Sequence, residues 1–297
     1  MVNQKCLVLL ATYNGASFLT QQIDSILNQE NISITLIVSD DMSTDSTLKI
    51  INSYEDTRIK LLPNVGRFGS ASQNFFRLIR DTDFELFEFI AFADQDDIWR
   101  SDKLISSIYA IKETRSDAFS SNVLAFWEDG TKEVVHKSSK QKKFDYMFSS
   151  AGPGCTYVVK NELLTGFKKK LTEKRELTKK IDLHDWLLYA FAKSNNYNWY
   201  VSDVITMDYR QHSNNEFGAN SGFSTFLYRW KRARDGWYRK QIINTAEFCE
   251  INNNIIKLIK RNRYVDRIKL LKNIFQCRRY KKEAIFLALT IVLPGYK

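Results

Sequence analysis

The sequence predicts an α/β protein with a mostly parallel sheet, flanked by helices and followed by a basic helical C-terminal extension. Apolar β-rich runs alternate with helical spacing over the first hundred residues, polar clusters follow the runs, and helical spacing dominates beyond residue 221. At 297 residues, 44% of them hydrophobic, the chain can bury a substantial core. The four cysteines show no CxxC spacing, so neither a zinc site nor a disulfide framework is predicted.

The predicted elements follow in a regular order through the first hundred residues. Short apolar runs predict strands at residues 6–11, 34–38, 59–62 and 87–93. Helical spacing of apolar residues predicts the intervening helices at residues 17–28, 46–54 and 71–80. Beyond residue 112 the pattern is less regular, and it predicts strands at 118–126 and 156–159 and a helix from Asp185.

Polar clusters follow three of the predicted strands. They are Thr12-Tyr13-Asn14, Asp40-Asp41 and Asp94-Gln95-Asp96-Asp97. Because ligands of parallel α/β sheets bind outside the carboxyl ends of the strands, the three clusters mark the expected site.

The third cluster crowds carboxylates that repel one another unless a cation, a hydrogen-bond donor or water compensates them. Asp94 and Asp96 suit a divalent metal that holds a diphosphate, since Mg²⁺ and Mn²⁺ accept oxygen ligands and are often bound by one or two carboxylates. An acidic turn before the helix that starts near Ser101 is the alternative interpretation.

The second cluster has two interpretations as well. A carboxylate of Asp40-Asp41 could accept the imide N–H of a uracil or thymine ring on which Tyr13 stacks. Turn chemistry and capping of the next helix by Asp45 or Ser46 would explain the same composition.

The net charge of +10 is unevenly distributed. Residues 221–297 carry 18 Lys and Arg against 5 Asp and Glu, a balance of +13, whereas residues 1–220 sum to −3. We therefore expect a catalytic domain at 1–220 and a basic amphipathic region at 221–297 that meets an anionic surface. The apolar run at 284–293 is too short to span a bilayer, but it can lie in the membrane interface.

Seven motifs occur in the order found in a known enzyme family. Four are "LLATYNGASFLTQQIDSILNQ", "IVSDDMSTDSTLKII", "NVGRFGSASQNF" and "AFADQDDIWRSDKL"; the others are "GPGCTYVVKNEL", "LHDWLLYAFA" and "YRQHSNNEFGAN". Over about residues 5 to 220 the chain resembles family 2 glycosyltransferases of the GT-A fold, and the last three motifs resemble the bacterial rhamnosyltransferase branch. The resemblance implies an inverting transfer from a nucleotide-activated sugar.

The resemblance also implies roles for individual residues of the donor site. Ala11, Tyr13 and Asp41 would line the nucleobase pocket, Asp94 would approach the ribose and the metal, and Asp96 would ligate the metal that bridges the diphosphate. The further donor-site candidates are Asn14, Asn64, Arg67 and Asn74. The loop at 69–72 is longer than the commonest form in the family, which leaves the role of Arg67 open.

The later motifs imply the remaining roles. Asp185 falls where the family keeps its catalytic base, with a helix N-cap as the alternative; one carboxylate must take the acceptor hydroxyl's proton. His212 lies in a stretch that in relatives closes over the donor phosphates, so the resemblance makes it a candidate metal ligand, with Arg210 available for charge pairing. Trp99 and Trp186 could stack on sugars or belong to the core.

These features together predict a Mg²⁺- or Mn²⁺-dependent glycosyltransferase. The leading donor is dTDP-L-rhamnose, a UDP-hexose is the alternative, and the acceptor is a lipid-linked oligosaccharide of a bacterial surface polysaccharide. An N-terminal apolar segment too short for a signal peptide predicts a cytoplasmic location, peripheral on the inner face of the cytoplasmic membrane. A homo-oligomer through the C-terminal helices is a further expectation.

Two other functions compete with this prediction. A nucleic-acid-binding protein would explain only the basic tail, because residues 1–220 lack a basic excess. A nucleotidyltransferase would explain the acids and the sheet, but "ATYNGAS" has one Gly and no Lys and so does not form the expected phosphate loop.

Overall fold

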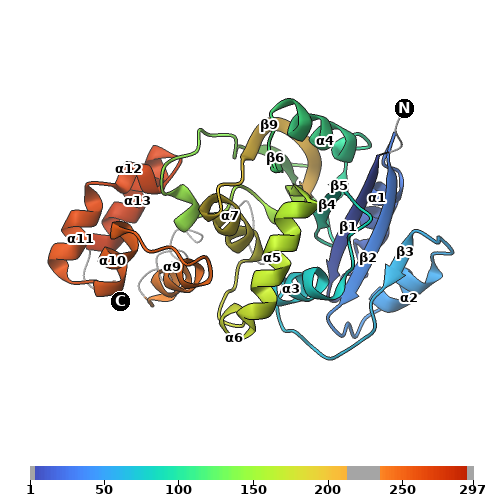
Figure 1. The fold of residues 1–297 in the computed structure, drawn as a ribbon. Coiled ribbons are helices and arrows are strands. Elements are labelled where there is room, and N and C mark those ends of the chain that lie inside the picture. Colours follow the sequence, from blue (N-terminus) through green and yellow to red (C-terminus); the bar gives the residue numbers. More distant parts are fainter. Residues whose placement is uncertain (1–3, 213–234, 293–297) are drawn as a thin grey trace.

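The computed structural model describes residues 4–212 and 235–292. Its strands are β1 (Lys5–Thr12), β2 (Ser33–Asp40), β3 (Ile59–Leu61), β4 (Phe89–Ala93), β5 (Ile98–Trp99), β6 (Ala118–Phe126), β7 (Lys132–Val135), β8 (Val158–Lys160) and β9 (Trp199–Arg210). Within the described residues they form one mixed sheet in the order β3-β2-β1-β4-β8-β6-β9-β5, with β7 paired to β6 (Figure 1).

Helices cover both faces of this sheet. They are α1 (Leu19–Leu27), α2 (Thr47–Ser53), α3 (Ala71–Asp81), α4 (Lys103–Glu113), α5 (Asn161–Glu173), α6 (Arg175–Thr178) and α7 (His184–Ser194). The core on one face includes α1 and α4, and the core on the other face includes α3, α5 and α7. The sheet is therefore a buried central layer, as the sequence predicts.

The half of the sheet that includes β1 to β4 forms close to its predicted positions. β1 pairs in parallel with β2 and β4, and β3 adds to the outer edge of β2. Alternate residues of β1 enter opposite cores: Leu7 and Leu9 share a core with α3, whereas Val8 and Leu10 share one with α1. Because helices cover both faces, these strands are apolar along most of their length, which makes their sequence signal strong.

The other half of the sheet is mixed and was predicted less completely. β8 is antiparallel to β4 and β6, while β9 runs parallel to β6 and antiparallel to β5. β8 begins at Val158, later than predicted, because the preceding residues form the 3-10 turn η2 (Gly154–Thr156). β9 was not predicted, since polar residues interrupt its apolar pattern. Its pairing with β5 brings Arg210 to the end of β4.

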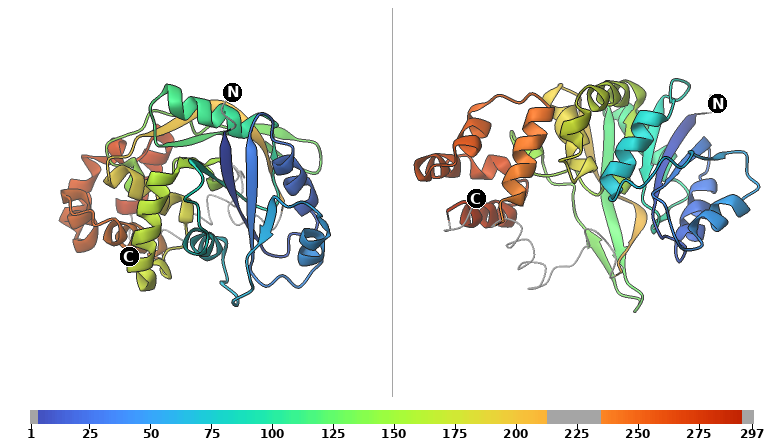
Figure 2. Two further views of the ribbon diagram at one scale, coloured as in Figure 1. Left: turned by 45° about the vertical axis from the view of Figure 1, so that its right-hand side comes forward. Right: turned by 90° about the horizontal axis from the view of Figure 1, so that it is seen from below.

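The described C-terminal helices are α9 (Trp237–Phe248), α10 (Asn254–Arg261), α11 (Tyr264–Leu271), α12 (Ile274–Cys277) and α13 (Lys281–Val292). They gather at the end of the molecule opposite β1 to β3 (Figures 1 and 2). Ile242, Phe248 and Leu287 belong to the same core as α7, so this region packs on the catalytic half of the chain. The predicted boundary at residues 220 and 221 lies outside the described residues, as does Leu293.

α13 contains most of the apolar run predicted at 284–293. Ala284, Leu287 and Ile291 are buried, whereas Ile285 and Leu289 are each more than half exposed. One side of the run therefore packs against the protein and the other faces solvent. Across residues 4–212 and 235–292, every helix is too short or too polar to cross a bilayer.

Candidate active site

The first two polar clusters meet where β1 and β2 end. Asp40 accepts hydrogen bonds from Thr12 Oγ1 at 3.0 Å and from Ser43 N and Oγ at 2.8 and 2.6 Å. Asp40 therefore stabilises its own turn. Buried Asp41 instead faces the loop before α3, where it accepts main-chain N–H groups of Phe68 and, at 2.8 Å, of Gly69. The two adjacent acids have different surroundings, and Asp41 orients the loop that borders the expected donor pocket.

The end of β1 is tied to the end of β4 by Gln95, which sequence analysis did not assign a role. Its Oε1 accepts from Tyr13 N at 2.8 Å, and its Nε2 donates to Tyr13 O at 3.0 Å. A Cβ added to Gly15 would lie 2.3 Å from Gln95 Oε1, so a larger residue there would displace the Gln95 side chain. Asn14, in the left-handed region at φ 46°, accepts from Thr44 N at 2.8 Å. These contacts join three loops into one rim.

Tyr13 and Arg67 lie together on this rim. Arg67 Nη2 donates to Tyr13 Oη at 2.8 Å, and its guanidinium lies 4.7 Å from the centroid of the Tyr13 ring. Ala11 is buried at the end of β1, and Asn64 Oδ1 accepts from Gly66 N in the neighbouring loop. The structure thus places Arg67 beside the predicted stacking residue.

Asn74 has a different position from the other donor-site candidates. It is buried on α3, where its amide donates to Ser39 O at 2.8 Å and to Thr12 O at 3.3 Å. Arg77, also buried, donates to Ser39 Oγ at 2.7 Å. These two side chains hold the ends of β1 and β2 against α3, so Asn74 supports the pocket from behind.

The third cluster meets the end of β9. His212 Nε2 lies 2.8 Å from Asp96 Oδ2, and the His212 ring stacks on Phe18 with centroids 4.9 Å apart. Arg210 Nε donates to Asp96 O at 2.8 Å, and Arg210 N donates to Asp97 Oδ1 at 3.2 Å. The structure therefore brings Asp96 together with Arg210 and His212, which follow it in sequence by more than one hundred residues.

Asp97, which sequence analysis did not list as a ligand, lies beneath the acidic turn. It is fully buried, and its Oδ2 has no hydrogen-bond partner within the described residues. Burial, followed by the charges of Asp96 and Asp94, raises the pKa of Asp97 well above its ordinary value. One possible ligand atom from each of Asp94, Asp97 and Cys155 lies within 4.8 Å of the other two.

A buried lysine lies beside this acidic turn. Lys103 Nζ donates to Cys155 O at 2.6 Å and lies 4.0 Å from the centroid of the Trp99 ring. Burial lowers the pKa of Lys103 to about 8, although nearby charges including Asp97 oppose this change. Trp99 is itself buried, which corresponds to the core interpretation of this residue. The positive charge of Lys103 therefore partly compensates the negative charge of the acidic turn.

Asp185 lies in the first turn of α7, whose N-cap position is occupied by Leu183. The main-chain N–H of Trp186 donates to Asp185 Oδ1 at 2.7 Å. Burial raises the pKa of Asp185 to about 6, opposed by hydrogen bonds from Trp186 and Ser150 and by the charge of Lys137. A carboxyl group with this pKa is mostly ionised at neutral pH and can accept a proton.

The residues that flank Asp185 in sequence are uncharged. Burial lowers the pKa of His184 to about 3, so its ring is neutral, and it stacks on Phe75 with centroids 4.0 Å apart. Trp186 is buried and donates to Tyr146 O at 2.9 Å, again a core position.

The "GPGC" motif joins the two acidic sites. A Cβ on Gly154 would lie 2.8 Å from His184 Nε2 and 3.1 Å from Asp185 Cβ, so only glycine allows this close approach. The next residue, Cys155, adjoins Asp94 and Asp97. The candidate base and the acidic turn are therefore neighbours across a two-residue segment.

This sheet has acids after the carboxyl end of β4, a strand β9 that ends at Arg210, and His212 just beyond that strand. The arrangement defines a GT-A-type glycosyltransferase. The chain belongs to glycosyltransferase family 2, whose model, described as "Glycosyl transferase family 2", matches residues 7–171.

Comparisons with individual proteins extend beyond that segment. The chain is 40% identical to a dTDP-rhamnosyl transferase of Shigella flexneri, over 96% of this chain and 99% of that protein. It is 28% identical to a UDP-Glc:alpha-D-GlcNAc-diphosphoundecaprenol beta-1,3-glucosyltransferase of Escherichia coli, over 68% and 76% of the two chains. The S. aureus TarS structure with UDP-GlcNAc shares the fold at TM-score 0.56 and 16% identity, over 99% and 89% of the chains.

Proposed function

We propose that this glycosyltransferase transfers L-rhamnose from dTDP-L-rhamnose, with inversion, to a lipid-linked oligosaccharide of a bacterial surface polysaccharide. The observation that carries the reaction type is the position of Asp94 beside Cys155 and of Asp185 beside the adjacent Gly154, together with the contact between Asp96 and His212. The Shigella flexneri relative supports the choice of donor, because its similarity extends over nearly the whole of both chains.

The nucleobase is assigned to the rim at the ends of β1 and β2. Asp41 accepts the imide N–H of thymine, and its bonds to Phe68 and Gly69 hold the carboxylate in place. Arg67 covers one face of the Tyr13 ring, and the base stacks on the other face. The small side chain of Ala11 allows the base to approach β1. Asn14 and Asn64 shape the adjoining loops.

The donor diphosphate is assigned to the acidic turn with a divalent cation. Asp96 Oδ2 and His212 Nε2 lie 2.8 Å apart and offer an oxygen and a nitrogen to such an ion, and the Asp94 carboxylate lies two residues before Asp96. Mg²⁺ or Mn²⁺ is bound by groups of this kind. When bound, the cation would neutralise charge on the departing diphosphate. Arg210 adds positive charge at the same place.

Asp185 is assigned as the catalytic base. Its burial sets a pKa of about 6, so the carboxylate is ionised at neutral pH yet basic enough to take the acceptor hydroxyl's proton. The flanking residues, neutral His184 and buried Trp186, add no charge beside the carboxylate. Inversion requires one such carboxylate opposite the leaving group.

A lipid-linked acceptor fits the C-terminal helices. Apolar side chains are exposed on α11, α12 and α13, and basic side chains are exposed on the same segment. We define this apolar-basic surface by Tyr264, Val265, Ile268, Lys269, Lys272, Phe275, Lys281, Lys282, Ile285 and Leu289. The Escherichia coli relative is named for a diphosphoundecaprenol acceptor. We propose that the surface binds the anionic face of the cytoplasmic membrane peripherally, from the cytoplasmic side.

The donor is tested by a panel of nucleotide sugars with and without EDTA, followed by binding and slow hydrolysis. We expect dTDP-L-rhamnose to bind most tightly, in a metal-dependent manner. Preference for a UDP-hexose would support the alternative donor, to which the glucosyltransferase relative points. Full activity in EDTA would contradict the metal assignment.

The membrane proposal is tested by co-sedimentation with vesicles. The parent protein should bind vesicles rich in phosphatidylglycerol and not neutral ones, and Ile285→Ser with Leu289→Ser should remove binding. Leu86→Ser is the matched control, because Leu86 is also exposed but lies outside the C-terminal helices. Binding to neither vesicle, together with a dimer that the double variant dissociates, would favour a homo-oligomer instead.

A further inference from the structure

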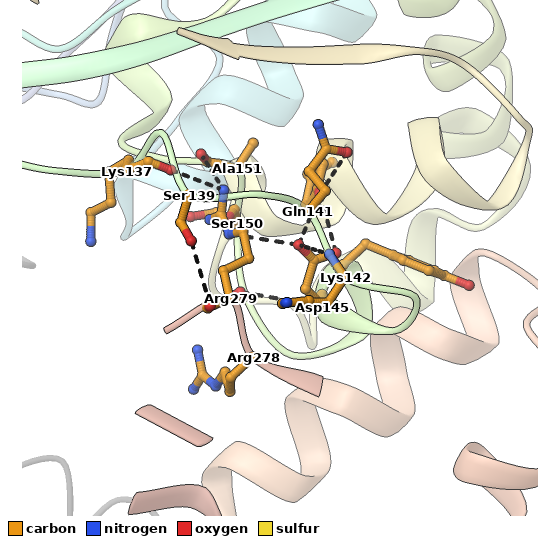
Figure 3. Close-up of polar contacts among 12 residues, drawn as sticks. Lys137, Ser139, Gln141, Lys142, Asp145, Ser150, Ala151, Arg278 and Arg279 are labelled. Atoms are coloured by element: carbon orange, nitrogen blue, oxygen red, sulfur yellow. Dashed lines mark hydrogen bonds and ion pairs between the residues drawn. The ribbon is translucent and has the colours of Figure 1, made fainter. Parts of the chain in front are cut away.

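Arg279 connects the C-terminal helices to the catalytic half of the protein. It lies between α12 and α13, and only 8% of it is exposed. Its guanidinium donates to three main-chain carbonyls of the loop at 137–151: Lys137 O at 3.3 Å, Ala151 O at 3.0 Å, and Ser150 O (Figure 3). A single side chain thus binds both ends of this loop.

Asp145, in the middle of the loop, completes the arrangement. Its Oδ2 lies 3.6 Å from Arg279 Nε, and it is fully buried. Lys142 N and Tyr189 Oη, the latter on α7, both donate to Asp145 at 3.2 Å. Removal of one partner of such a buried ion pair strongly destabilises the surrounding structure, because the other charge is left buried without compensation. The loop is therefore held between α7 and the C-terminal helices.

Ala151, one of the residues whose carbonyls Arg279 binds, is linked to Asp185 through Tyr157. Its neighbour Ser150 stabilises the same end of the loop by donating from Oγ to Gly152 O at 2.9 Å. Ala151 N donates to Tyr157 Oη at 3.0 Å, and Tyr157 Oη lies 3.4 Å from Asp185 O. Two paths therefore run from Arg279 through the loop to α7: one passes through Ala151 and Tyr157 to the Asp185 carbonyl, and the other passes through Asp145 to Tyr189.

We propose that Arg279 is a positioning residue for the transfer reaction: it holds the loop at 137–151 in the geometry that orients Asp185. The proposal rests on the assignment of Asp185 as the base. In this arrangement the C-terminal helices contribute to catalysis directly, through a loop that they fix beside the acceptor side of the site. Nucleotide binding, at the ends of β1 and β2, does not depend on Arg279.

The test uses Arg279→Ala in the full chain. We expect the turnover number for transfer to fall about tenfold or more while donor affinity changes less than about twofold. Added methylguanidinium should restore part of the lost turnover, because it can occupy the vacated site and bind the same carbonyls. A purely structural role would not show this rescue at constant donor affinity.

Arg239→Ala is the matched control. Arg239 also belongs to the C-terminal helices and also donates to two main-chain carbonyls, but these belong to Ile259 and Lys260. Its loss should leave turnover unchanged. Should Arg279→Ala fail to fold, Tyr157→Phe decides, since it removes the hydroxyl that links Ala151 N to Asp185 O and keeps the carbonyls that Arg279 binds.

Two outcomes would overturn the proposal. One is that turnover stays within about twofold of the parent in Arg279→Ala or, if that variant does not fold, in Tyr157→Phe. The other is an Arg279→Ala loss of turnover that matches a loss of donor affinity and that methylguanidinium does not restore. The assignment of Asp185 as the base is tested separately. If Asp185→Asn retained turnover, that assignment would be wrong, whatever the result at Arg279.

Discussion

Asp96 and Asp185 are both carboxyl groups of the candidate site, yet their surroundings differ. Asp96 contacts the imidazole of His212, and its main chain accepts from Arg210. Asp185 is buried beside uncharged His184 and Trp186, and burial raises its pKa to about 6. These surroundings suit Asp96 to metal binding together with His212 and suit Asp185 to accepting a proton. The contrast supports the roles proposed for the two acids.

The largest effect is expected from Asp96→Ala. Loss of the carboxylate removes the central candidate metal ligand, so turnover should fall by roughly 1,000-fold and metal-dependent donor binding should weaken with it. Transfer rates and calorimetric titration with the donor, each with and without added Mn²⁺, measure both quantities. A variant with near-normal turnover would remove Asp96 from the metal site.

Asp185→Asn should come next. The substitution keeps the shape of the side chain and removes its ability to accept a proton, so turnover should fall roughly 100-fold or more. Donor affinity should stay within about twofold, in contrast to Asp96→Ala. If donor binding falls as much as turnover, the two acids share one role and the contrast fails.

His212→Ala tests whether His212 binds the metal together with Asp96. A lost metal ligand weakens metal affinity by roughly 10- to 100-fold, which excess Mn²⁺ should largely overcome. The measurement is turnover as a function of Mn²⁺ concentration. A fall in turnover that saturating metal leaves unchanged would assign His212 to another function.

The pH dependence of the transfer rate tests the role of Asp185 as the base. Protonation of the base below its pKa of about 6 should lower the rate of transfer, by about tenfold at one unit below that value. The raised pKa means that the folded state holds this proton more tightly than the unfolded chain, so acidification to pH 5 does not destabilise the fold through Asp185. A rate that stays constant to pH 5 while the protein remains folded would contradict the assignment.

Much of the fold was accessible from the sequence because its signals are local. β1, β2 and β4 form within two residues of their predicted bounds, since buried parallel strands read as continuous apolar runs. The acids at the end of β4 were found for the same reason. β9 was missed, because its ladder with β6 joins segments about eighty residues apart and its own pattern mixes polar and apolar residues.

The sequence alone determined the family, the strand-end acids, the candidate base and the basic C-terminal region, because each is written in a contiguous motif or in composition. Tertiary structure decided which side chains face one another. It placed Trp99 and Trp186 in the core, turned Asn74 behind the pocket and brought Arg279 to the loop beside Asp185. Burial and contacts between distant segments set these outcomes, and neither is visible in a local stretch of sequence.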